Sequence, residues 1–329
     1  MSSPDDFDYA TAPTADRLIL RREVIRQGST DADIRRALGE NTIERVWWGS
    51  YVPTRTDDDS DVFAARAQRY REMVLSARRT GGPERYLSHQ SAACILDVPL
   101  LQPDMSTVHF TTERTGRTSP GLVIHQSPGI TTELVESSGI IVTGIGRTVC
   151  DVARQGTFRQ AVCALESGLY QAQLRKLAID LPPIVAQMSR MHGIGVLREA
   201  LALAQECSES IGESLSKVVI VEAGTIALPE QQVEIVIADG STKRCDFGWR
   251  DADGRLRVVG EFDGRFKYHR SSAASGHRLP EDVIYAEKLR EDAIRDCGIV
   301  VVRWTWGDLQ NPAKFARKLL DALRRGGII

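Results

Sequence analysis

Residues 257–268 read RVVGEFDGRFKY and end an apolar run with two acids, Glu261 and Asp263. The apolar run predicts a largely buried strand, and side chains two apart on a strand lie on the same face. A carboxylate is costly to bury unless a counter-charge lies beside it. Carboxylate oxygens are the ligands that hard divalent cations prefer. The pattern therefore points to a strand end that binds a metal ion.

The hairpin expected before this strand brings a third acid to the same place. Asp253-Gly254 is the favoured pair for the centre of a two-residue type I′ turn. Ala252 then faces Arg255, and the residue numbers of every facing pair sum to 507, so Asp246 falls opposite Glu261. Facing residues share one face of the sheet with their side chains about 5 Å apart. Three carboxylates are thus predicted on one patch.

Three carboxylates on one patch repel one another, and burial would force them to take up protons. A bound Mg²⁺ or Mn²⁺ ion would remove this conflict, because both ions favour oxygen ligands. The alternative is a longer loop with a different register, which would separate the acids onto an exposed edge.

Further candidates flank the patch. Glu213, on the preceding predicted helix, is either a fourth oxygen ligand or an ordinary surface residue. Lys267 is placed to stabilise negative charge on a phosphate or to orient water, and Lys288 is its alternative. The candidate catalytic residues are Asp246, Glu261, Asp263 and Lys267, and the candidate metal ligands are Asp246, Glu261, Asp263 and Glu213.

The elements that must position these residues form a mixed sheet with helices on its faces. From residue 208 the patterns predict a helix, three strands, a helix, a strand and a final helix. We expect this unit, residues 207–329, to be a restriction-endonuclease-like αβββαβ domain.

The front of the chain has a different pattern. Residues 15–56 predict short helices, a tight turn and a β-hairpin, which together make a winged helix-turn-helix. The helix expected at about Thr42–Val46 would read a DNA groove. Arg35, Arg36 and Arg45 are the candidate contacts to nucleic acid, although each of them would also suit a solvated helix face.

The remaining segments complete a multi-domain α+β and α/β chain. Residues 1–14 are expected to be a disordered leader, and residues 57–206 a central α+β domain that begins with a helix over 62–80. His109 and His125 fall on predicted strands, where lone histidines more often have a structural role than a catalytic one.

Composition and charge narrow the class of protein. No apolar run approaches the roughly 18 residues of a membrane span, and the acidic start does not resemble a signal peptide. The six scattered cysteines suit reduced thiols in the cytoplasm. Residues 241–329 hold 18 Lys and Arg against 13 Asp and Glu, whereas residues 91–240 hold 10 against 16. Residues 15–90 hold 14 against 12, so both ends are mildly basic, which permits nucleic-acid binding without requiring it.

The C-terminal unit resembles the DUF559 group of PD-(D/E)xK endonuclease-like domains, which are related to very-short-patch repair endonucleases. The residues that carry the resemblance are CDFGW, VVGEFDGRFKY, EKLREDAIRDCG and VVRWTWGDL, over about residues 207–323. The resemblance implies a metal-dependent phosphodiester hydrolase, with Asp246 and Glu261 as the paired acids. Asp263 stands where that family usually has its lysine, so catalysis would need Lys267 or Lys288 as a substitute.

The front of the chain resembles AbiEi-type bacterial antitoxins through RVWWGSYVP, YLSHQSAACILDVPL and GRTVCDVAR. This resemblance implies DNA binding, and for true antitoxins repression of their own promoter, with a possible toxin partner. Three hypotheses follow: a DNA endonuclease, a non-catalytic regulator or antitoxin with a degenerate nuclease domain, and an acidic protein–protein module.

Overall fold

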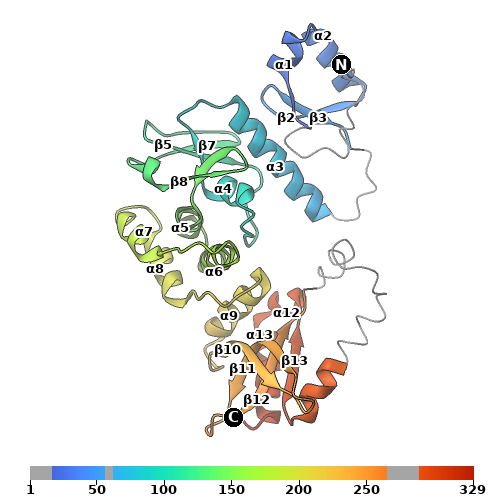
Figure 1. The fold of residues 1–329 in the computed structure, drawn as a ribbon, viewed down its shortest axis with the longest axis vertical. Coiled ribbons are helices and arrows are strands. Elements are labelled where there is room, and N and C mark those ends of the chain that lie inside the picture. The colour runs from blue at the N-terminus through green and yellow to red at the C-terminus, as the bar shows by residue number, and fades with distance from the viewer. Residues whose placement is uncertain (1–16, 56–61, 265–288) are drawn as a thin grey trace. The chain divides into compact units, whose positions relative to one another are not determined.

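The computed structural model describes residues 17–55, 62–264 and 289–329 (Figure 1). The chain is a multi-domain mixed α/β protein with three separate β-sheets in the described ranges. Its contacts define two compact units, Met1–Val152 with Leu181–Ile184, and Ala153–Asp180 with Val185–Ile329. The domain boundaries expected from the sequence, at 56/57 and 206/207, are still predictions.

The first unit opens with a small sheet and two helices. Strand β1 (Ile19–Leu20) leads into α1 (Arg21–Arg26) and α2 (Asp31–Gly39), and strands β2 (Ile43–Trp47) and β3 (Ser50–Pro53) follow in the order β1-β3-β2. Gly28 ends the first helix with φ of +100°, a conformation that suits glycine. Thr30 begins the second with a capping box to Asp33.

The helix expected at Thr42–Val46 is wrong. Residues 43–47 form strand β2, because Ile43, Val46 and Trp47 are β-branched or aromatic and suit a half-buried pleated surface. Arg45 therefore lies on a hairpin strand. Arg35 and Arg36 lie on α2, the helix that follows the tight turn.

The rest of the first unit is built on a six-stranded sheet in the order β6-β7-β5-β4-β9-β8. Helix α3 (Val62–Thr80) has the bounds that the sequence predicts, and α4 (His89–Ile95), a 3₁₀ turn (Ile130–Glu133) and α5 (Ile145–Gln155) accompany the sheet. The strands are β4 Tyr86–Leu87, β5 Val108–Thr112, β6 Arg117–Ser119, β7 Leu122–Gln126, β8 Leu134–Ser137 and β9 Ile140–Thr143.

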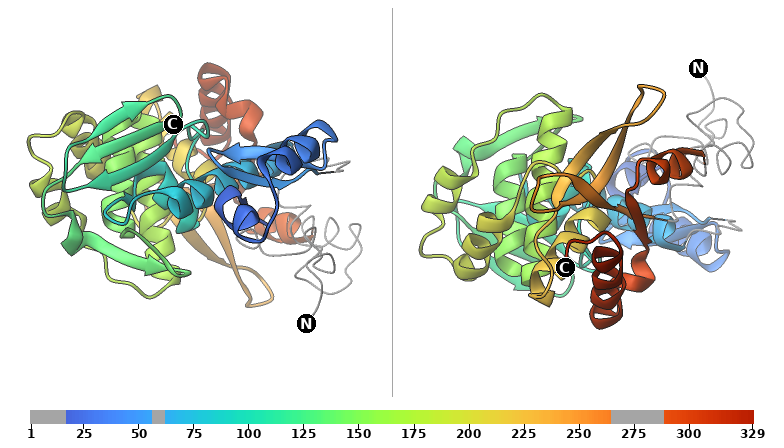
Figure 2. Two further views of the ribbon diagram at one scale, coloured as in Figure 1. Left: turned by 90° about the horizontal axis from the view of Figure 1, so that it is seen from above. Right: turned by 90° about the horizontal axis from the view of Figure 1, so that it is seen from below.

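The second unit has the element order predicted for the C-terminal part. Its sheet runs β10-β11-β12-β13, antiparallel except for the parallel pair β12–β13. Figure 2 shows the twist of the strands. The strands are β10 Glu230–Val236, β11 Thr242–Arg250, β12 Leu256–Phe262 and β13 Val300–Trp304. The helices are α6 Phe158–Leu174, α7 Leu181–Gln187, α8 Ile194–Leu203, α9 Ile211–Ala223, α12 Trp306–Leu309 and α13 Pro312–Arg325, and residues 289–296 are also helical. The boundary between the two units falls within α7.

Helices cover both faces of this sheet. On one face Trp304 is fully buried against Phe315 of α13, and its indole Nε1 donates to Ser216 of α9 at 2.7 Å. On the other face Ile294, in the helical segment 289–296, packs with a cluster that includes Val259. No helix in the described ranges is long and apolar enough to cross a membrane.

A buried ion pair joins two helices of the second unit. Lys217 of α9 donates to Glu166 of α6, and the two side chains are 1% and 0% exposed. Glu166 also accepts from Gln205 N at 3.0 Å and from Ser208 Oγ at 2.6 Å. The lysine also donates to the carbonyl of Leu203 at 3.1 Å. Both charges are therefore hydrogen-bonded, the condition under which a buried pair is tolerated.

Replacing Lys217 by Met should destabilise the fold by about 3–5 kcal/mol, because Glu166 would keep a buried charge with no cation beside it. Arg159→Ala is the matched control, since Arg159 and Glu222 join the same two helices through half-exposed side chains. The free energy of unfolding of this control variant should fall by less than about 1 kcal/mol. Urea denaturation measures both values, and similar losses would contradict a special role for the buried pair.

Candidate functional site

The register of the β11–β12 hairpin agrees with the sequence prediction, although its turn does not. Phe247 faces Gly260 and Trp249 faces Val258, so facing residues sum to 507 as expected. The turn, however, is closed by a hydrogen bond from Asp251 N to Arg255 O at 2.9 Å, with Gly254 at φ +78°. This is a three-residue turn rather than the predicted two-residue turn.

The longer turn is offset by a one-residue bulge in the strand pairing. Near the turn Arg250 faces Leu256, a sum of 506, and the pairing shifts by one residue between Arg250 and Trp249. A β-bulge of this kind places an extra residue, here Arg257, on one strand. Beyond it the register is the predicted one.

Asp246 lies where the β11–β12 pairing ends. Its Oδ2 accepts a hydrogen bond from the backbone N–H of Phe262 at 2.8 Å. A side chain thus satisfies a donor that a continued ladder would have paired with a backbone carbonyl. Phe262 stands between Glu261 and Asp263, so the contact brings the carboxylate of Asp246 beside the strand end that carries the other two acids.

Glu261 is neutralised by arginines. Its two oxygens pair with Arg290 and Arg303 at 2.8 Å each, and its side chain is 11% exposed. Arg303 faces it directly on β13, and Arg290 also donates to the carbonyl of Arg244. Burial, followed by the charge of Glu261, raises the pKa of the Cys245 thiol to about 12. The carboxylate is therefore largely buried with its counter-charges in place.

The three acids do not form a preformed metal site. Asp263 is half-buried, and its N–H donates to Trp304 O at 2.7 Å. In the described residues, one group of three side chains has metal-ligating atoms within 4.8 Å of one another, and it consists of His89, His109 and His125 rather than of the acids. Mg²⁺ or Mn²⁺ binding by the acids is still a prediction.

Glu213 is buried at the start of α9, 3% exposed. Its carboxylate accepts from Glu209 N at 2.9 Å, from Ser210 Oγ at 2.7 Å and from Gln232 Nε2 at 2.9 Å. It therefore caps the helix and holds β10, and a metal ion would have to compete with these donors. Lys267 and Lys288 lie outside the described residues.

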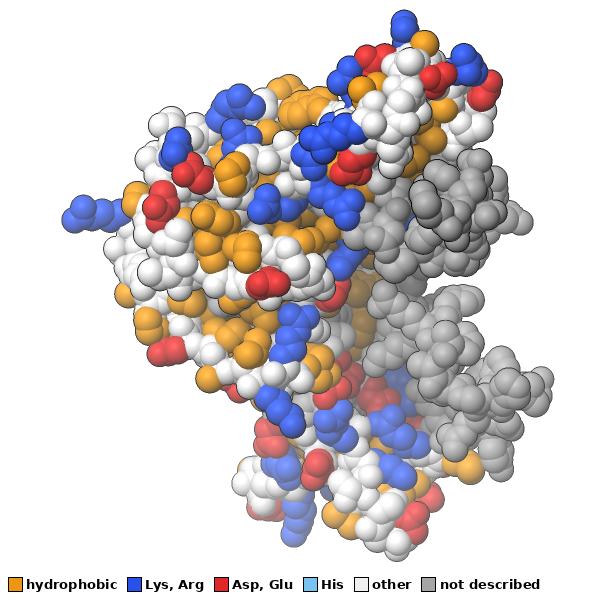
Figure 3. Space-filling model, turned by 45° about the horizontal axis from the view of Figure 1, so that its top comes forward, with side chains coloured by type: hydrophobic (Ala, Val, Ile, Leu, Met, Phe, Trp, Pro, Cys, Tyr) orange, Lys and Arg blue, Asp and Glu red, His pale blue; other side chains and the backbone are white. Residues whose placement is uncertain are grey.

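The predicted nucleic-acid contacts are all exposed. Arg36 pairs with Asp33 at 3.3 Å, and Arg35 Nε donates to the carbonyl of Asp31 at 3.2 Å. Arg45 lies over the ring of Tyr51 on the hairpin. Figure 3 shows basic and acidic side chains interspersed in the N-terminal region, at the top of the view. The arginines are accessible, although acids beside them reduce the local positive charge.

The sequence analysis missed the histidine cluster. It treated His109 and His125 as separate strand residues and did not single out His89. The strands that carry His109 and His125, β5 and β7, pair in parallel, and this pairing brings their side chains together. The residue spacing alone contains no signal for such a pairing, because β6 intervenes in the chain.

No family model matches the chain. Uncharacterized proteins from two strains of Mycobacterium tuberculosis are each 27% identical to it over 215 residues. The matched region covers 64% of this chain and 72% of each of those proteins. The names of these relatives assign them no activity.

Replacing Asp246 distinguishes its backbone contact from its charge. Asp246→Asn keeps an acceptor oxygen for Phe262 N–H, so we expect little loss of stability. Asp246→Ala leaves the N–H unpaired, which should cost about 1–3 kcal/mol in urea denaturation. Equal stability of the two variants would show that the hydrogen bond contributes nothing measurable.

Proposed function

We propose that this chain binds DNA and that its C-terminal sheet carries a metal-dependent phosphodiester-hydrolysing site. The observation that supports the catalytic part best is the contact of Asp246 with Phe262 N–H, because it gathers the paired-acid positions at one strand end. The resemblance to PD-(D/E)xK endonuclease-like domains assigns those positions to Asp246 and Glu261.

The donor set fits a hard divalent cation. Asp246, Glu261 and Asp263 offer carboxylate oxygens, the ligands that Mg²⁺ and Mn²⁺ favour. Such an ion would supply an activated water and neutralise charge on the phosphate.

To bind the ion, Glu261 must exchange at least one arginine for it, since both of its oxygens are paired. Arg290 is 35% exposed, so its guanidinium, once released, would be available to a phosphate, whereas Arg303 also pairs with Glu291 at 3.3 Å.

The same ion pairs favour a second candidate, a DNA-binding regulator or antitoxin without catalysis. A carboxylate that two arginines already neutralise does not need a cation, and Asp263 replaces the usual lysine of the motif. In this form the sheet would be a scaffold, the chain would act by occupying a promoter, and a toxin would be a possible partner.

DNA binding is common to both candidates. Residues 17–55 have a helix, a tight turn, a second helix and a hairpin in succession, as expected of a winged helix-turn-helix. The second helix, α2, exposes Arg35 and Arg36, and the hairpin exposes Arg45 and Trp48. We propose α2 as the element that enters the major groove and the β2–β3 hairpin as the wing.

Calorimetry with Mn²⁺ separates the two candidates. The hydrolase predicts binding by the wild type that is lost in Glu261→Gln and in Asp246→Asn. Arg290→Ala should bind more tightly than the wild type, because it removes a competing cation from Glu261. A wild type that binds no Mn²⁺ and cleaves no form of DNA would leave the regulator as the function.

DNA binding is tested with a random duplex at several salt concentrations. Arg36→Ala and Arg35→Ala should each weaken binding and lower the slope of log K against log salt by about 1. The control is Arg324→Ala, since Arg324 is an exposed arginine on α13 paired with Asp321. Affinities unchanged in both α2 variants would contradict the winged-helix assignment.

A further inference from the structure

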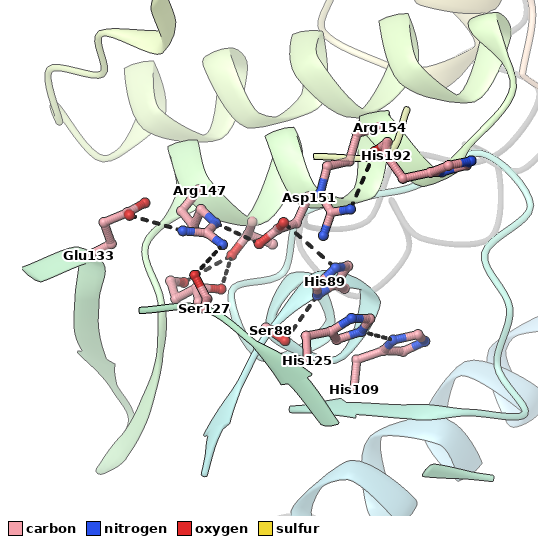
Figure 4. Close-up of polar contacts among 12 residues, drawn as sticks. Ser88, His89, His109, His125, Ser127, Glu133, Arg147, Asp151, Arg154 and His192 are labelled. Carbon is pink, nitrogen blue, oxygen red and sulfur yellow. Dashed lines mark hydrogen bonds and ion pairs between the residues drawn. The ribbon is translucent and has the colours of Figure 1, made fainter. Parts of the chain in front are cut away.

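Three histidines meet in the first unit, and none of them has a part in the proposed function. His89 begins α4 and is fully buried, His109 on β5 is 8% exposed, and His125 on β7 is half-buried. Figure 4 shows the three rings grouped together beside the sheet, and their centroids are 3.9–5.4 Å apart. They come from three elements that are separate in the chain, so their meeting is a product of the fold.

Their nitrogens are close. His109 Nδ1 and His125 Nε2 are 3.0 Å apart, and one nitrogen of each of the three rings lies within 4.8 Å of the others. In a tetrahedral zinc site with Zn–N of about 2.0–2.1 Å, neighbouring nitrogens are about 3.3 Å apart. The His109–His125 pair is near that spacing, and the third nitrogen needs to move by at most about 1.5 Å.

A buried polar frame supports the cluster. The Asp151 carboxylate lies 3.7 Å from His89 Nε2 and accepts from Arg147 Nε at 2.7 Å (Figure 4). Arg147 also binds Glu133 at 2.9 Å and Ser127 Oγ at 3.0 Å. Carboxylates beside ligand histidines are the usual means of orienting their rings in metal sites.

Two simpler explanations of the cluster are weaker. Ser88 Oγ lies 3.0 Å from His89 Nδ1, so Ser88, His89 and Asp151 have the composition of a nucleophilic triad. All three side chains are fully buried, however, and no substrate reaches them.

Plain packing is the other explanation. It would rest on the hydrogen bond between His109 Nδ1 and His125 Nε2, 3.0 Å apart, which accounts for two of the three rings, whereas a metal ion accounts for the approach of all three.

We propose that His89, His109 and His125 bind a divalent transition-metal ion of the zinc class. Three imidazole nitrogens select Zn²⁺, Ni²⁺ or Cu²⁺ over Mg²⁺, so the site differs in chemistry from the acids of the second unit. The ion would join the start of α4 to β5 and β7, and with three protein ligands its fourth position would hold a water molecule. The rings of His89 and His125 are stacked with their centroids 3.9 Å apart, so metal binding would require them to rotate.

The test is zinc titration of the full-length protein after removal of metals with a chelator. Calorimetry should give one Zn²⁺ per chain, and His125→Gln and His109→Gln should each weaken binding at least tenfold. His192→Gln is the matched control, since His192 is outside the cluster and its loss should change nothing. Binding unchanged in both cluster variants, or no binding in the wild type, overturns the proposal.

Co²⁺ on the wild type keeps the test decisive if a cluster variant fails to fold. Tetrahedral Co²⁺ bound by nitrogen gives visible d–d bands without the charge-transfer bands of thiolate ligands, and Zn²⁺ should displace it. Saturating Zn²⁺ should also raise the melting temperature of the wild type, because an ion that binds only the folded state stabilises it. Thiolate bands, or no shift in melting temperature, would overturn the site.

Discussion

The second unit depends on a charge pair with no access to solvent. Glu166 and Lys217 join α6 to α9, and Ser208 carries the network on to β10 by accepting from Gln231 at 2.8 Å. Helix α9 in turn supplies Ser216 to Trp304, the largest fully buried side chain of the sheet. Because each partner of the pair is satisfied only in one arrangement, it specifies how the helices and the strands meet. Phe262, which stands between the acids at the end of β12, packs against Gly212 of the same helix α9.

Three of the buried carboxylates in the described residues are compensated by cations of the same chain. Asp151 has Arg147, Glu166 has Lys217, and Glu261 has Arg290 and Arg303. Each choice avoids the cost of an unpaired buried charge. A metal ion at Glu261 would therefore have to displace an arginine, so metal binding is a competition between cations.

The patterns with a strong local cause were predictable from the sequence. Helix α3 and the strands that carry His109 and His125 follow from periodicity and turn residues. The helix expected at Thr42–Val46 failed because a short apolar run suits either a helix or a strand, and the pairing with β3 decides it. The arginines around Glu261 and the histidine cluster were not predictable, since Arg303 and the His109–His125 contact arise from parallel pairings of distant segments, and Arg290 and His89 come from helices packed beside them.

The bulge at Arg257 also constrains how this hairpin can change in length. The three-residue turn and the extra residue each shift the pairing by one, in opposite senses, and only their sum keeps the acids in register. A deletion in the turn alone, or loss of the bulge alone, would turn every side chain of one strand to the other face. Insertions and deletions at the two positions are therefore coupled, so a single-residue change at one is tolerated only with its counterpart at the other.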